Sequence, residues 1–308
     1  MDREKLEFDE YQQKARDTNR IPYSKENAGE LTEDIIPLLG LAGEAGDLLT
    51  EYKKRLRDGD SYVVFKDRVK EELGDIIWYV SNFADRFDLK LSEIVHYNLR
   101  KTSERFNDTC SIDALDVDLT QDQRFPQTFE IEFREIELDG HKKIQLLVNG
   151  NELPPETTVG AALTDNAYKD DGYKFHDSMH LAFVAILGWS PVMRKLLKEA
   201  KVIRAVRDGV IDEVEDGGRA KVIDEGLIAL IFSYASKRNL LNGIDTIDYS
   251  LLRTIKEMTD HLEVSCRSPA DWQKAIIDGF SIWRKLQKNN GGRVYIDRQK
   301  RLIEYIES

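Results

Sequence analysis

The chain has 308 residues, of which 41% are hydrophobic and 33% are charged, so it is long enough for two ordinary domains and is not disordered in bulk. Its formal net charge of −12 disfavours nucleic-acid binding, because an acidic surface repels a polyanion and the basic clusters are short. The sequence has no apolar run of about 20 residues, no secretory signal and only two cysteines, so we expect a soluble cytoplasmic protein without a membrane anchor or a disulfide framework.

The first hundred residues have the apolar spacing of amphipathic helices. Pro37 would lie in the first turn of the second helix, where proline is tolerated, and Ser92 would be the N-cap of the fourth. The pattern therefore predicts a helical domain over residues 1–107, with helices over 6–16, 34–57, 63–87 and 93–106.

The pattern changes after this domain. Residues 129–133 alternate between apolar and polar side chains, which is the period of a strand. The phase slips at residues 134–135, as a bulge would cause, and the dipeptide Asp139-Gly140 predicts a hairpin turn with a return strand. We expect a linker with a β-hairpin over 108–160 and a second helical domain over 161–308 that stays helical to its end, so the fold class is mainly α with a small β insert.

The two halves of the chain share an internal repeat. Residues 69–102 align without a gap on residues 222–255, at a constant offset of 153, and the alignment places Glu72 on Glu225. The identities are few, so chance similarity between amphipathic helices is one explanation, but the matching acidic positions favour a diverged duplication. Two more pairs coincide upstream at an offset of 133, Glu44 with Asp177 and Asp47 with His180.

Acidic pairs recur on two consecutive predicted helices, among apolar residues and glycines. Glu44 and Asp47 lie three residues apart, as do Glu72 and Asp75, so each pair projects from one helix face. Four such acids in a bundle interior would raise one another's pKa, and a hard divalent cation removes this cost. Because oxygen ligands favour Mg²⁺, the sequence predicts a magnesium site; solvated surface acids are the alternative that a single pair would suggest.

The motifs at residues 40–47, 71–79 and 98–101, with Arg105-Phe106, closely resemble those of the MazG-like all-α nucleotide pyrophosphohydrolases over residues 8–106. The resemblance implies a helical bundle that forms homodimers or homotetramers, holds Mg²⁺ or Mn²⁺ in its place, and hydrolyses a nucleoside triphosphate to a monophosphate and pyrophosphate. By position, the implied metal ligands are Glu44, Asp47, Glu72 and Asp75. Asp47 stands where the family usually has glutamate, which shortens one ligand.

These ligands suggest the roles of the neighbouring residues. A metal-activated water would attack the α-phosphorus, and Glu71 or Glu72 would accept its proton. For Lys53 and Lys54, an ordinary place in the last turn of a helix explains the pattern equally well. The candidate ligands of the phosphate tail are Lys53, Lys54, Asn98, Lys101 and Arg105.

The second half carries a polar cluster of its own, formed by His176, Asp177, His180 and Glu225. In one interpretation this half is a degenerate partner domain whose two histidines, one helical turn apart, belong to the core. In the other it forms a separate pocket that holds a metal or senses a nucleotide, because histidine and carboxylate at this spacing can bind a transition metal. The first interpretation is favoured, and a second magnesium site is not expected, since Ile228 replaces Asp75 in the repeat.

Two functions from different classes fit the sequence. The first is a nucleoside triphosphate pyrophosphohydrolase, acting on ribo- or deoxyribonucleotides. The alternative is a non-catalytic nucleotide-binding or assembly protein with a regulatory C-terminal domain. The complete set of four acids in the first half favours the enzyme, because a binding protein has no need to keep every metal ligand.

Overall fold

The computed structural model describes residues 6–20, 30–106, 115–138, 140–152, 163–203 and 209–307. Two compact units divide the chain, Met1–Thr102 and Ser103–Ser308, and each is described by itself. Helices predominate and are accompanied by one small antiparallel sheet, so the expected mainly α fold class is confirmed. Within the ranges just given, no helix is both long and apolar enough to span a membrane.

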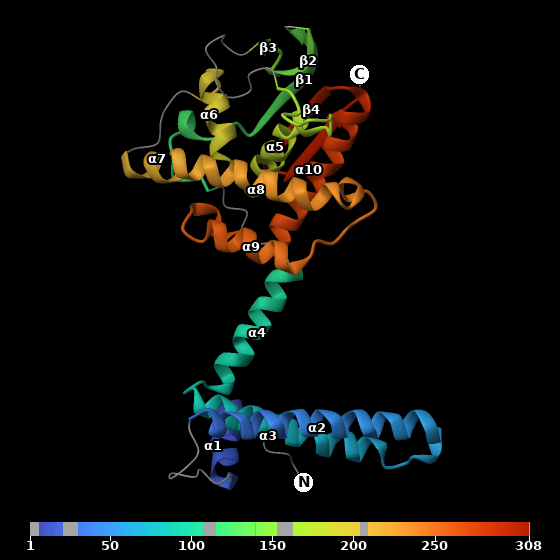
Figure 1. The fold of residues 1–308 in the computed structure, drawn as a ribbon. Helices are drawn as coiled ribbons and strands as arrows, with labels where there is room; N and C mark the ends of the chain where they lie inside the picture. The colour runs from blue at the N-terminus through green and yellow to red at the C-terminus, as the bar shows by residue number, and fades with distance from the viewer. Residues whose placement is uncertain are drawn as a thin grey trace. The chain divides into compact units, whose positions relative to one another are not determined.

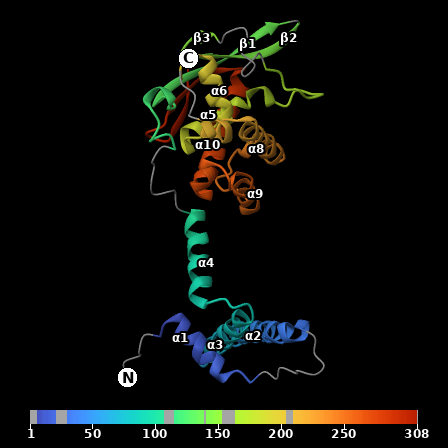
Figure 2. The ribbon, with the colours of Figure 1, turned by 90° about the vertical axis from the view of Figure 1, so that its left-hand side faces the viewer.

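The first unit contains the helices expected from the sequence, with shifts of a few residues at their ends (Figures 1 and 2). The helices α2 and α3 pack along each other, and a short 3₁₀ turn, η1 (Gly59–Ser61), connects them. Because α2 begins at Glu30, Pro37 lies inside the helix and not in its first turn, which corrects the expectation. The bounds are α1 (Phe8–Thr18), α2 (Glu30–Asp58), α3 (Phe65–Arg86) and α4 (Leu91–Phe106).

Side chains of α1 supply the partners of the first amides of α4. The carboxylate of Asp9 accepts hydrogen bonds from the Ser92 amide at 3.1 Å and the Ser92 hydroxyl at 2.9 Å. The side chain of Gln12 accepts one from the Leu91 amide at 2.8 Å. Ser92 therefore lies inside α4, and its predicted role as N-cap is wrong. The first amides of a helix have no partner within the helix, and here a neighbouring helix provides it.

The second unit combines a helical core with the sheet. Its helices are α5 (Asp177–Leu187), α6 (Pro191–Glu199), α7 (Gly209–Glu215), α8 (Gly218–Ser236), α9 (Tyr249–Thr259) and α10 (Pro269–Asn289). Its strands are β1 (Thr128–Leu138), β2 (His141–Val148), β3 (Asn151–Glu152), β4 (Gly292–Asp297) and β5 (Leu302–Ile306). Short 3₁₀ turns complete it: η2 (Gln121–Gln123), η3 (Tyr173–Phe175), η4 (Asn239–Leu241) and η5 (Glu263–Cys266).

The predicted hairpin is present as β1 and β2, but without the predicted bulge. The antiparallel register runs without a break from Ile131 opposite Val148 to Leu138 opposite His141. The pattern changes for another reason: β4 begins opposite Phe133, so the later residues of β1 are paired with β2 alone and leave the core. Asp139 of the predicted turn lies outside the described residues, and Gly140 has a φ of +73°.

Two strands at the C-terminus correct the expectation of helix to the end. Asn290, in the left-handed region, terminates α10, and β4 and β5 follow. The strand order is β3-β2-β1-β4-β5, so the hairpin belongs to the same sheet as the C-terminal strands. Gly291 has a φ of +130°, and a Cβ there would overlap the carbonyl group of Phe133, so only glycine allows this approach of β4 to β1.

The helix α5 lies at the centre of the second unit, and every one of its residues is buried. It contacts α6, α8 and α10 as well as β4 and β5 (Figures 1 and 2). Gly279 allows α10 to pack closely against α5, because a Cβ at this position would come within 2.6 Å of the Met179 sulfur. The segment that carries His176 and His180 is therefore held by packing from several sides.

Candidate metal centre

The α2–α3 pair brings three of the four predicted metal ligands together. Glu44 of α2 and Glu72 and Asp75 of α3 each offer a carboxylate oxygen, and these oxygens lie within 4.8 Å of one another. Asp47, one turn further along α2, is exposed, but its charge is close enough to affect Glu72. The i, i+3 spacing therefore aims acids from two helices at one place, as expected from the sequence.

The electrostatics of this acid cluster favour a cation. The pKa of Glu72 is raised, first by desolvation and then by the negative charges of Asp47 and Glu44 and a hydrogen bond with Glu44. A raised pKa means that the surroundings destabilise the charged carboxylate. A divalent cation among the same oxygens would reverse this effect, and such a set of oxygen ligands suits Mg²⁺.

The candidate base Glu71 lies outside this cluster. Its side chain is exposed and forms an ion pair with Arg68 at 2.6 Å. Of the two candidate bases, Glu72 is therefore the one that the structure places with the other candidate metal ligands.

The two lysines of α2 differ in their surroundings. Lys54 forms an ion pair with the buried carboxylate of Glu51 at 2.5 Å, and the Tyr62 hydroxyl donates a hydrogen bond to the same carboxylate. These contacts, with Lys54 first, lower the pKa of Glu51. Lys53 is exposed. Lys54 thus has a structural partner, and Lys53 projects into solvent.

The remaining candidate phosphate ligands lie on α4. Asn98 and Lys101 are exposed. The side chain of Arg105 lies outside the described part of the chain. Among the described residues, α4 has no extensive contact with α2 or α3, which carry the acid cluster.

The aromatic residues beside the acid cluster pack within the unit. The indole N–H of Trp78 donates a hydrogen bond to the Thr18 hydroxyl of α1 at 2.9 Å. The ring of Tyr79 lies so close to Gly40 that any Cβ at that position would overlap it. These contacts give Trp78 and Tyr79 a packing role within the unit.

The second unit gathers the other predicted residues into a histidine cluster, defined here as His176, Asp177, His180 and Glu225. His176 immediately precedes α5, Asp177 and His180 lie on it, and Glu225 lies on α8. The Glu225 carboxylate is 3.6 Å from His180 Nε2 and 3.9 Å from His176 Nε2. A carboxylate oxygen of Asp177 is 3.7 Å from His176 Nε2. One ligand atom from each histidine and from Glu225 lies within 4.8 Å of the others.

Asp224 is a residue of this site that was not among the candidates named from the sequence. It is fully buried and lies 3.0 Å from His180 Nδ1, while the Ser190 hydroxyl and the Val192 amide donate to its other oxygen. Burial alone lowers the pKa of His180, but Asp224 and Glu225 outweigh it and raise that pKa to about 10. A signal was present in the repeat, because Asp224 aligns with the acidic residue 71.

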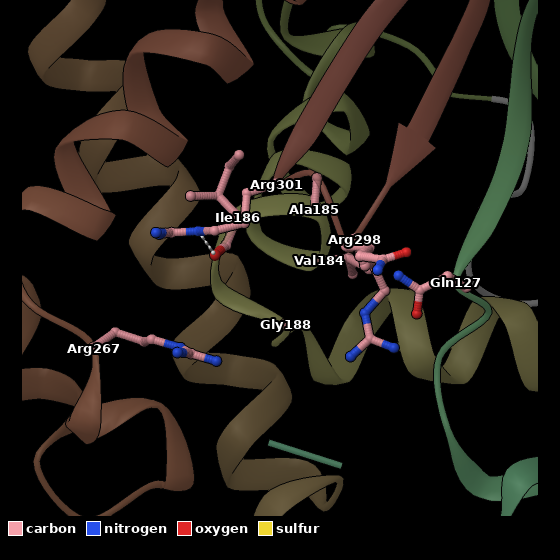
Figure 3. A pocket seen from close by; sticks show the side chains of 9 residues that line it. Gln127, Val184, Ala185, Ile186, Gly188, Arg267, Arg298 and Arg301 are labelled. Carbon is pink, nitrogen blue, oxygen red and sulfur yellow. Dashed lines mark hydrogen bonds between the residues drawn. The ribbon is translucent and has the colours of Figure 1, made fainter. Parts of the chain in front are cut away.

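A basic pocket of about 520 Å³ lies at the C-terminal end of α5 (Figure 3). Arg301 donates to the carbonyl of Ile186 at 3.1 Å, and Arg267 donates to the carbonyl of Leu187 at 2.9 Å. Arg298 is paired with the buried Asp116 at 2.8 Å. Positive charge on the last carbonyls of a helix is favourable, so these arginines stabilise the end of α5. The positive charge of the pocket is therefore explained without a bound ligand.

Comparison with known proteins identifies the second unit. The model of the MazG C-terminal domain matches residues 110–308, which is more than half of the chain. The chain belongs to the MazG C-terminal domain family. The expected MazG-like family with an extension domain is thereby confirmed. The part matched to the MazG C-terminal domain includes the whole histidine cluster and lies beyond the acid cluster of α2 and α3.

A curated relative covers a smaller part of the chain. The "Gene 37 protein" of Mycobacterium phage L5 is 41% identical over 69 residues, which are 22% of this chain and 60% of the phage protein. The match thus spans less than two thirds of that relative's length. No solved structure matches the chain.

Proposed function

We propose that the protein is a Mg²⁺-dependent nucleoside triphosphate pyrophosphohydrolase whose active site is the acid cluster of the first unit. The observation that carries this proposal is the convergence of Glu44, Glu72 and Asp75, whose oxygens lie within 4.8 Å. Membership in a MazG-related family is consistent with a hydrolase. The motif resemblance over residues 8–106 supports cleavage between the α- and β-phosphates.

Each acid of the cluster has its own role in the proposed reaction. Bound Mg²⁺ would lower the pKa of a water molecule and offset charge on the triphosphate. Glu44 and Asp75 would hold the cation, and Asp47 would add negative charge from the next turn of α2. Glu72 would accept the proton of the attacking water, because its carboxylate lies beside those of Glu44 and Asp75, whereas Glu71 is exposed and paired with Arg68.

We also propose that the first unit associates with a second copy. The helices of this unit expose large apolar side chains, among them Leu39, Leu49 and Leu56, which is 85% exposed. Exposed apolar surface of this kind marks an interaction site. A homodimer or homotetramer would cover it, and a second chain could supply Asn98 and Lys101 to the triphosphate.

The test is pyrophosphate release from a panel of ribo- and deoxyribonucleoside triphosphates in the presence of Mg²⁺. Glu72→Gln keeps the size of the side chain but removes the base, so we expect kcat to fall by on the order of 100-fold or more. Asp67→Asn is the matched control, since Asp67 is exposed in the first turn of the same helix. No pyrophosphate from any triphosphate with the wild-type protein would contradict the proposal.

One observation favours the alternative of a non-catalytic nucleotide-binding protein. Asn98 and Lys101 are exposed, and in the part of the chain that the structure describes their helix α4 has no extensive contact with the helices that carry the acid cluster. Under this alternative, calorimetry would detect triphosphate binding with Mg²⁺, while the same samples would release no pyrophosphate. The two functions are therefore separated by a single pair of measurements.

A further inference from the structure

The histidine cluster of the second unit has the chemistry of a second, different metal site. We propose that it binds a divalent transition-metal ion through Nε2 of His176, Nε2 of His180 and the carboxylate of Glu225, with a further coordination position open to solvent. The ion would be one that accepts nitrogen ligands, with Zn²⁺ as the first candidate.

The orientation of both imidazole rings supports this site. His180 Nδ1 lies 3.0 Å from the Asp224 carboxylate, and His176 Nδ1 lies 2.9 Å from the carbonyl oxygen of Tyr173. Both partners are acceptors, so each Nδ1 keeps its proton, and each Nε2 is the nitrogen that a metal ion would bind once any proton on it is released. A metal-binding histidine is held in this way, with its other nitrogen donating to a carboxylate or a backbone carbonyl.

The histidine cluster contains buried polar atoms without a hydrogen-bond partner. His180 is completely buried and its Nε2 has no hydrogen-bond partner, and the same holds for Oδ2 of the buried Asp177. A buried polar atom without a partner is costly and calls for an explanation. A bound ion would give His180 Nε2 its missing partner.

The distances between the ligand atoms fit a small ion. Bonds of about 2.0 Å in tetrahedral geometry place neighbouring ligand atoms about 3.3 Å apart. The Glu225 oxygen lies 3.6 Å from His180 Nε2 and 3.9 Å from His176 Nε2. These separations exceed a hydrogen bond and are close to those of a metal site, so a small contraction would complete the coordination.

The charges around the cluster also favour a cation. Asp177, Asp224 and Glu225 place three carboxylates around two imidazoles. No lysine or arginine in the described part of the chain forms an ion pair with any of the three. A divalent ion would compensate much of this negative charge, and the Ser190 hydroxyl and the Val192 amide already stabilise Asp224.

The nature of the ligands separates this site from the acid cluster of the first unit. In the repeat, His180 takes the place of Asp47, and the buried Ile228 takes the place of Asp75, while Glu225 keeps the place of Glu72. Imidazole nitrogen suits Zn²⁺ and related ions, whereas Mg²⁺ requires oxygen.

The coordination position left by three protein ligands would face solvent. The side chain of Glu225 is 47% exposed, whereas His180 is inaccessible. Three protein ligands and an open position are typical of zinc sites that bind water or substrate. We therefore expect the ion to be exchangeable and to accept an external ligand.

The test uses the full-length protein, freed of metal by a chelator and titrated with Zn²⁺ or Co²⁺ in a buffer with excess Mg²⁺. We expect one equivalent to bind by calorimetry and visible absorption bands from the Co²⁺ form. His176→Gln and Glu225→Gln should weaken binding at least tenfold, because each removes one of the three proposed ligands. His261→Gln, which changes a histidine outside the cluster, should bind like the wild type.

Glu72→Gln separates this proposal from the proposed pyrophosphohydrolase. Zn²⁺ binding should be retained in that variant, because the acid cluster of the first unit is not involved. Circular dichroism checks that His176→Gln and Glu225→Gln remain folded, and it avoids reliance on the buried His180. Unchanged Zn²⁺ affinity in both of these folded variants, or loss of binding in Glu72→Gln, would overturn the second site. Pyrophosphate release would still be decided by its own assay.

Discussion

Asp224 shows how much a single buried carboxylate can determine. It accepts hydrogen bonds from Ser190 and Val192 at the start of α6, and it lies against His180 of α5. Three elements thus meet at one side chain with no exposed surface. Its importance follows from contacts with other helices. The sequence of its own helix does not distinguish it from the neighbouring acidic residue, Glu225.

Replacement of this carboxylate tests how much it contributes to the stability of the fold. Asp224→Asn should lower the free energy of unfolding by about 1–3 kcal/mol, because an amide cannot accept all the hydrogen bonds that the carboxylate accepts. Urea denaturation of the metal-free protein measures the change. Glu225→Gln, half exposed on the same helix, is the control and should change the value much less. Equal effects of the two substitutions would contradict this role.

Gly40 and Gly43 provide a matched pair of glycines in α2. Gly40→Ala should destabilise the first unit by about 1–3 kcal/mol, because the new methyl group would overlap the ring of Tyr79. A Cβ at Gly43 would have nothing within 4 Å, so Gly43→Ala should stabilise the helix by up to about 1 kcal/mol. Thermal unfolding compares the two, and a shift of the same sign in both would show that the Tyr79 contact is not decisive.

At the level of elements, both ends of α5 are held by charge. Asp177 lies in the first turn, and Arg267 and Arg301 donate to the carbonyls of the last two residues. Both placements are favourable for a helix dipole. The segment that presents the two histidines is therefore fixed at its ends as well as packed along its sides.

Removal of one arginine tests this arrangement. Arg301 also pairs with the fully buried Asp271, so Arg301→Gln leaves a buried charge with less compensation and should cost about 3 kcal/mol. Arg253→Gln is the control, because Arg253 forms an exposed i, i+4 pair with Glu257 that is worth less than about 1 kcal/mol. Denaturant unfolding distinguishes the two, and similar stabilities of both variants would contradict the role of Arg301.

The elements differ in how well they could be predicted. The long helices of the first unit were predictable because amphipathic periodicity is a local signal. The cap of α4 was not, since Asp9 is 83 residues away from Ser92. The strands β4 and β5 were also missed, because six and five residues carry little periodicity and their pairing with β1 is non-local.

The same distinction applies to the sites. The i, i+3 acids and the pair of histidines were visible in sequence spacing, and the structure brings Glu44, Glu72 and Asp75 together. The residues that orient the histidines could not be identified from the sequence. Tyr173, for example, contacts His176 through a backbone carbonyl that any residue could provide. Sequence spacing therefore indicates ligands better than it indicates what orients them.

At the level of the whole molecule, the exposed apolar surface of the first unit predicts self-association. Light scattering after size exclusion should give a mass that is a multiple of 35.5 kDa. Leu49→Glu, at a side chain 71% exposed, should shift the protein toward the monomer, because a charge cannot be buried in an apolar interface. Val210→Glu, at an exposed position of the second unit, is the control. A monomeric wild-type protein at micromolar concentration would contradict this prediction.

The pairing of β4 with β1 has a practical consequence for expressing parts of this protein. A fragment that stops after α10 would lose the neighbour that covers one edge of β1 from Thr128 to Phe133. An uncovered strand edge readily pairs with other chains, so such a fragment should precipitate or form aggregates. A soluble version of the second unit therefore has to retain its C-terminal strands, although they lie far in sequence from both the acid cluster and the histidine cluster.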